Sequence, residues 1–172
     1  PMRLAVRPSL LALFAATAIG AAHGQAQPPL KVGLMLPATG TFAALGDMIE
    51  RGFRLYVQEQ GGKLGGREIQ YFRVDDESDP SKATDNVNKL IKRDNVDVIV
   101  GTVHSGVALA MARAVKESKT MLIVPNAGAD AITGPLCAPN ILRSSFSNWQ
   151  PGYATGVMAA RASSTSMHSV SG

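Results

Sequence analysis

Short apolar runs alternate with amphipathic stretches from Leu30 onward. Four runs have the length and the β-branched or large aliphatic content of strands, at residues 31–36, 69–74, 96–100 and 121–124. The stretches between them are predicted helices: residues 43–60, a segment opening at Asp79-Pro80, and residues 107–119. Strands that alternate with helices predict right-handed βαβ crossovers, and so an α/β fold with a doubly wound parallel sheet.

The apolar spacing of the first two helices predicts which faces are buried. In the first, Leu45, Ile49, Phe53 and Tyr56 or Val57 recur at helical spacing. Asp79 followed by Pro80 is a favourable N-cap and first-turn pair for the second. That helix is expected to direct four apolar residues inward: Ala83, Val87, Leu90 and Ile91.

The pattern weakens after Pro125. Residues 126–140 are expected to form a loop, residues 141–143 a further short strand, and Asn148 the cap of a helix reaching residue 160. Residues 161–172 have no hydrophobic period, which predicts an irregular tail. The domain division that follows is one lobe over residues 27–145, the start of a second lobe over 146–160, and the tail.

The first 26 residues have the features of a secretory signal peptide. Arg3 and Arg7 are positive, residues 10–22 form an uncharged apolar run, and small residues follow at 22–26. A retained membrane anchor is the alternative, but the run is shorter than the ~20 residues of a comfortable span. The expected location is therefore the periplasm.

Composition and charge exclude several classes of function. With 45% hydrophobic and 17% charged residues, the chain is typical of a globular protein. Its net charge is +4, and without Arg3 and Arg7 there are 15 basic and 13 acidic residues, so no nucleic-acid partner is expected. The single cysteine, Cys137, is either a buried small hydrophobe or the partner of a cysteine elsewhere.

Catalytic and cofactor motifs are missing from the expected places. The first strand is not followed by a Gly-x-Gly-x-x-Gly fingerprint, and the sequence contains no phosphate-binding loop with Lys-Ser/Thr. His104 is the one usable general base, and a lone histidine at a strand end is more often a capping residue. We therefore expect a protein without catalysis, metal or cofactor.

A binding site is expected at the carboxyl ends of the strands, where open parallel sheets hold ligands. Residues 37–45, 75–79, 102–106 and 126–130 follow these ends. His104, Ser105 and Gly106 lie at a strand-to-helix turn, whose backbone N–H groups and helix dipole favour a carboxylate. The alternative is that Ser105 only caps its own helix.

Several short motifs in order resemble the leucine/isoleucine/valine-binding protein family, the type I periplasmic solute-binding proteins of ABC transporters. They are KVGLMLP (31–37), LGDM (45–48), GG (61–62), DDESDPSKA (75–83), VIVG (98–101) followed by Ser105, and VPNAGA (124–129). The resemblance implies two α/β lobes that enclose the ligand. It also implies that Ser105, Ala127 and Gly128 contact the ligand's polar groups and that Leu45 lines its side-chain pocket.

Gly128 departs from the family pattern, which has a hydroxyl residue there. The loss of this hydroxyl weakens the case for an α-amino acid. Residues 126–134 (NAGADAITG) and 143–150 (RSSFSNWQ) are similar to those of relatives that take up aromatic or other organic acids.

The function implied is that of a substrate-binding protein of an ABC importer for branched-chain amino acids or related carboxylates, with the transporter's permease subunits as partners. The alternatives are a binder of aromatic or organic acids and a periplasmic ligand sensor for a signalling partner. Because most of a second lobe is missing, we expect this chain to be a fragment that binds ligand weakly alone.

Overall fold

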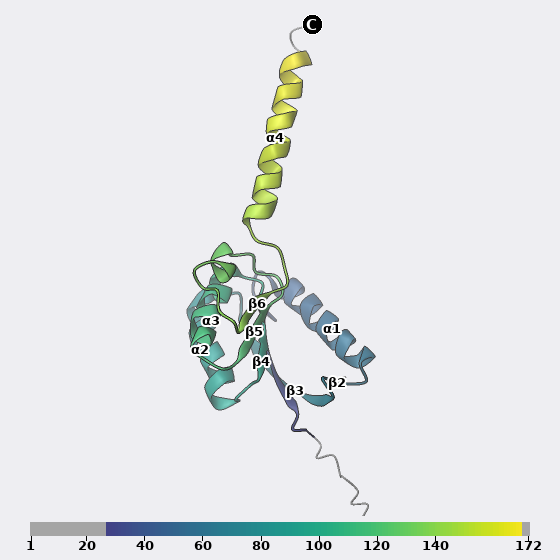
Figure 1. Ribbon diagram of the computed structural model, residues 1–172, viewed down its shortest axis with the longest axis vertical. Coiled ribbons are helices and arrows are strands. Elements are labelled where there is room, and N and C mark those ends of the chain that lie inside the picture. The colour runs from purple at the N-terminus through teal and green to yellow at the C-terminus, as the bar shows by residue number, and fades with distance from the viewer. Residues whose placement is uncertain (1–26, 170–172) are drawn as a thin grey trace, which may run out of the picture.

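The computed structural model describes residues 27–169, so the predicted signal peptide lies outside the described residues. A six-stranded sheet has the order β2-β3-β1-β4-β5-β6 (Figure 1). Five strands are parallel: β1 (Leu30–Leu36), β3 (Arg67–Asp75), β4 (Val98–Val100), β5 (Met121–Val124) and β6 (Ile141–Arg143). The doubly wound α/β prediction is confirmed, with one addition. The short β2 (Lys63–Leu64) pairs antiparallel with β3 and was not predicted.

Helices cover both faces of the sheet. The α1 helix (Ala43–Glu59) lies on one face, and α2 (Pro80–Asn88) and α3 (Ser105–Lys116) lie together on the other (Figure 1). A π-helical turn (Lys89–Arg93) extends α2. From β1 the chain goes outward to β3, and then returns across β1 to β4. The strand order therefore reverses between β1 and β4, where sheets of this kind hold ligands.

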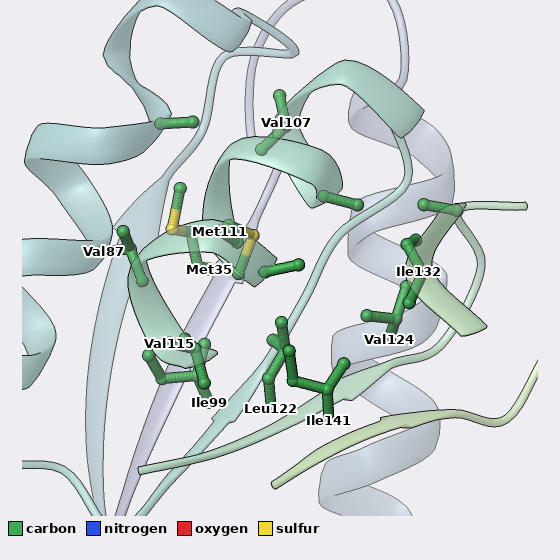
Figure 2. Close-up of a cluster of buried hydrophobic side chains, with 14 of the residues drawn as sticks. Met35, Val87, Ile99, Val107, Met111, Val115, Leu122, Val124, Ile132 and Ile141 are labelled. Atoms are coloured by element: carbon green, nitrogen blue, oxygen red, sulfur yellow. The ribbon is translucent and has the colours of Figure 1, made fainter. Parts of the chain in front are cut away.

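The core has two parts, because side chains of a strand alternate between its faces. Val32, Leu34 and Leu36 pack on the α1 side with Ile49 and Phe53. Figure 2 shows the larger part, between the sheet and α2 and α3. It includes these fully or almost fully buried residues: Met35, Val87, Ile99, Val107, Met111, Val115, Leu122, Val124, Ile132 and Ile141. Each large side chain buried here contributes about 1.5–3 kcal/mol.

The predicted helix faces are largely confirmed. Ala83 and Val87 of α2 and Leu90 of the π-helical turn that follows it are completely buried, and the Asp79 side chain accepts the Ser81 N–H at 2.8 Å as the N-cap. On α1, Val57 is buried and Tyr56 is 55% exposed, so Val57 takes the inward position. The third helix begins two residues earlier than predicted, at Ser105.

The last helix, α4 (Trp149–Ser169), begins directly after Asn148, as predicted, but continues beyond residue 160. The expectation of irregular structure from residue 161 is therefore wrong as far as Ser169. The segment has no glycine or proline after Gly156 within this helix, and a helix requires no hydrophobic period when it is not packed. The helix projects away from the body of the fold (Figure 1). In the described part of the chain, no helix is both long and apolar enough to cross a membrane.

Candidate functional site

The carboxyl ends of the parallel strands meet at one edge of the sheet. Five loops leave this edge, after β1, β3, β4, β5 and β6, and they contain or adjoin all six predicted site residues. The loops after β1 and β4 lie next to each other at the strand-order reversal. The geometry of these loops decides what the edge can bind.

The turn from β4 into α3 is capped by His104. Its backbone is extended, and its Nδ1 accepts the N–H groups of Gly106 at 3.0 Å and Val107 at 3.4 Å. The alternative that Ser105 caps α3 is therefore wrong. Within residues 27–169, no hydrogen bond engages the Ser105 hydroxyl. Ser105 can thus donate to a ligand, whereas the Gly106 N–H is already used.

Gly106 lets the starts of α2 and α3 approach each other. A Cβ atom at this position would lie 2.8 Å from Cγ of Pro80 and 2.9 Å from Cε1 of His104. These distances are shorter than van der Waals contact allows. The role of Gly106 is therefore to hold the turn in place.

Asp75 organises the loop after β1. Its carboxylate accepts the N–H groups of Ala38 (2.8 Å), Thr39 (3.3 Å) and Glu77 (2.9 Å), and the Thr39 hydroxyl at 2.7 Å. Partial burial acts to raise the pKa of Asp75, but these hydrogen bonds outweigh it and lower the pKa below its ordinary value. The carboxylate thus ties the β1 loop to the end of β3.

Asp76 is completely buried and joins three strand ends. It accepts hydrogen bonds from the Thr102 hydroxyl and, at 2.9 Å, from the Ser78 N–H. Burial raises the pKa of Asp76; these hydrogen bonds oppose the increase, and the negative charge of Asp75 adds to it. The Thr102 carbonyl in turn accepts the Ala127 N–H at 3.2 Å. The loops after β3, β4 and β5 are therefore linked through Asp76.

Sequence reasoning included residues 75–79 among the segments after the strands but gave Asp75 and Asp76 no role of their own, and it missed this linking role. The available signal was an acidic pair directly after a strand, at the edge where the ligand loops meet.

Ala127 and Gly128 follow β5 and are both buried. The Gly128 carbonyl accepts the Asn148 N–H at 2.8 Å. A Cβ at position 128 would lie 2.2 Å from Oδ1 of Asn148 and 3.1 Å from Cε2 of Phe146. A serine or threonine fits here only if the Asn148 side chain moves, and the glycine itself offers no hydroxyl donor.

Leu45 reaches the same edge through the start of α1. Its N–H donates to the Phe42 carbonyl at 3.0 Å, and the Phe42 ring lies 5.8 Å from the His104 ring. Leu45 is 38% exposed, whereas the sequence pattern placed it on the buried face of its helix. The side chain is therefore accessible to a ligand.

The described residues include no group of three or more His, Cys, Asp or Glu side chains arranged to hold a metal ion. Cys137 is exposed, so its interpretation as a buried hydrophobe is wrong.

Known proteins share this sequence pattern and this fold. The sequence profile described as periplasmic binding protein matches residues 29–170. The Leu/Ile/Val-binding protein homolog 6 of Brucella abortus is 28% identical over 122 residues, which cover 70% of this chain and 31% of that protein.

Two solved structures extend the likeness. A solute-binding protein of an ABC transporter from R. palustris, in complex with benzoate, is 57% identical with a TM-score of 0.76, over 78% of this chain and 38% of that one. A second, from Rhodopseudomonas palustris BisB5 in complex with 3,4-dihydroxybenzoic acid, is 34% identical with a TM-score of 0.64, over 69% and 32%.

The chain thus spans about a third of the length of the proteins it matches. The match to the family profile covers most of the chain, and the fold and motif order agree with it. The chain belongs to the periplasmic binding protein family, within the type I group of leucine/isoleucine/valine-binding proteins.

Proposed function

We propose that this chain supplies a ligand-binding lobe of a periplasmic substrate-binding protein, which delivers a small carboxylate to an ABC importer without catalysing a reaction. The observation that carries the proposal is the Ser105 hydroxyl, which has no partner among residues 27–169. It lies at the first turn of α3, beside the strand-order reversal. The helix N-terminus attracts a negative charge there, and the hydroxyl adds a directed donor.

An aromatic carboxylate is the ligand class we favour over an α-amino acid. An α-ammonium group needs polar partners, and position 128 is a glycine, which has no hydroxyl. Buried polar groups left without partners cost ~1–3 kcal/mol, so an amino acid would bind here at a disadvantage. The benzoate-bound protein from R. palustris is also more similar to this chain than is the Brucella relative, at 57% against 28% identity.

A second lobe is part of the proposal. The first half of α4 carries large apolar side chains that the described residues leave exposed, including Trp149 (60%), Tyr153 (68%) and Met158 (72%). We infer that another lobe covers α4 and closes over the ligand, with Leu45 contributing to the apolar wall. The permease subunits of the importer would receive the closed protein.

The proposal is tested by titrating the ¹⁵N-labelled chain with benzoate and, separately, with leucine, followed by heteronuclear NMR. Because one lobe leaves the ligand partly in water, we expect weak binding in the millimolar range. Benzoate should shift the amide signals of residues 102–106 and 126–128 and those near Leu45. A response to leucine alone would reject the aromatic ligand class. No response to either ligand at 20 mM, roughly twenty times a dissociation constant of 1 mM, would reject the binding function.

A further inference from the structure

Hydrogen bonds from two serines join the short segment after β6 to the loop after β5. The Ser145 hydroxyl donates to the Asn126 carbonyl at 3.1 Å. The Ser147 hydroxyl donates to the Asp130 carboxylate, and its N–H donates to Oε1 of Gln150 at 2.8 Å. The residue between these anchors, Phe146, therefore has a backbone fixed on both sides.

Phe146 lies at the ligand edge, and 49% of the residue is exposed. Its Cε2 lies 3.1 Å from the position that a Cβ on Gly128 would occupy, so the ring covers that glycine. Large apolar side chains are normally buried because exposure costs ~25 cal/mol per Å². The ring thus lies beside the buried pair Ala127 and Gly128, and its contacts there leave it partly exposed.

Gly128 is what permits this arrangement. Its lack of a side chain lets the Asn148 amide and the Phe146 ring approach its backbone, and its carbonyl fixes the Asn148 N–H at 2.8 Å. The same substitution that removes a hydroxyl from the site therefore admits an aromatic surface.

We propose that Phe146 is a specificity-determining residue, whose ring contacts the aromatic ring of the ligand while Ser105 binds its carboxylate. This inference rests on the proposed function, because it assigns the second contact of the same site. Aromatic rings attract one another in offset or edge-to-face geometry beyond the gain from buried area. A saturated ring of similar size gains the area alone, so the site should distinguish the two.

The experiment compares benzoate with cyclohexanecarboxylate, by the same NMR titration of the full chain. Wild type should prefer benzoate, by about 3- to 10-fold. Phe146→Leu keeps an apolar side chain and should abolish most of this preference, and Phe146→Ala should weaken benzoate binding by about 10-fold or more. Leu142→Ala is the matched control, because Leu142 is a similarly exposed apolar residue (51%) that lies on β6, before the segment that holds Phe146 and outside the ligand loops.

The outcomes separate the inference from the function on which it rests. If wild type binds benzoate and both Phe146 variants keep its affinity and its preference, the role of Phe146 is rejected and the carboxylate site stands. If wild type binds neither acid, the proposed function fails, and the inference with it. The amide spectrum of each variant reports directly whether it is folded, and Phe146→Leu decides the question should the alanine variant unfold.

Discussion

Replacement of Asp76 by alanine should destabilise the lobe far more than loss of an acidic residue usually does. The side chain is completely buried and links the ends of β3, β4 and β5 through Thr102. Alanine leaves the buried Thr102 hydroxyl and the half-buried Ser78 N–H without their acceptor. Each loss costs ~1–3 kcal/mol, so we expect the free energy of unfolding to fall by about 2–6 kcal/mol.

The pH dependence of an Asp76→Asn variant has a definite sign. Burial raises the pKa of Asp76 above its ordinary value of 3.8, so the folded protein holds this proton more tightly than the unfolded chain. The stabilisation is complete below that ordinary value and is lost as pH rises through the raised pKa. Asparagine stays neutral, so its stability relative to wild type should increase as pH rises from 3.8.

Urea unfolding followed by circular dichroism measures both effects. Asp47→Ala is the control, because Asp47 pairs with Arg51 at 2.8 Å on the exposed surface, where an ion pair contributes about 0–1 kcal/mol. A loss for Asp76→Ala no larger than that of the control would refute the linking role. A stability difference between Asp76→Asn and wild type that falls with rising pH would refute the direction of the pKa shift.

Four further substitutions test local contacts by the same unfolding assay. In α1, Gly46→Ala places a Cβ 2.0 Å from the Pro37 carbonyl oxygen and should lower the free energy of unfolding by about 1–3 kcal/mol. Gly52→Ala meets nothing within 4 Å and should raise it by about 0.5–1 kcal/mol. Equal effects of the two would contradict the packing of α1. Leu122→Ala in the core should cost about 2–5 kcal/mol, and a cost below 1 kcal/mol would mean that β5 is not buried as described. His104→Ala removes the cap of α3 and should cost about 0.5–2 kcal/mol, so an unchanged midpoint would exclude the cap.

The sheet could be predicted from sequence because its central strands are buried on both faces. Ile99 and Leu122 lie in continuous apolar runs between helices whose apolar spacing matches their buried faces. The Asp79-Pro80 start of α2 was equally local, because the cap contacts a residue two positions away. Such features depend on residues close together in the sequence, so the sequence alone predicts them.

The contacts that shape the site depend on residues far apart in sequence. Asp76 meets Thr102 across 26 positions, and Phe146 covers Gly128 after a strand and a loop. No periodicity predicts either contact. His104 was a candidate cap only in general terms, and a serine beside it is the commoner cap, so the choice between them required the backbone. The β2 strand has two residues, which is too short for an alternating pattern.

The most direct test of the account is the affinity of the chain for benzoate when Ser105 is replaced by alanine. The hydroxyl has no partner among residues 27–169, so its loss should leave the unfolding midpoint nearly unchanged. A lost hydrogen bond to a carboxylate costs ~1–3 kcal/mol, which corresponds to about 5- to 150-fold weaker binding. Ser118→Ala is the control, because Ser118 lies beyond the other end of α3 and bonds the Val115 carbonyl at 2.8 Å. The account predicts weaker binding for Ser105→Ala alone, and benzoate affinity equal to wild type in that variant would contradict it.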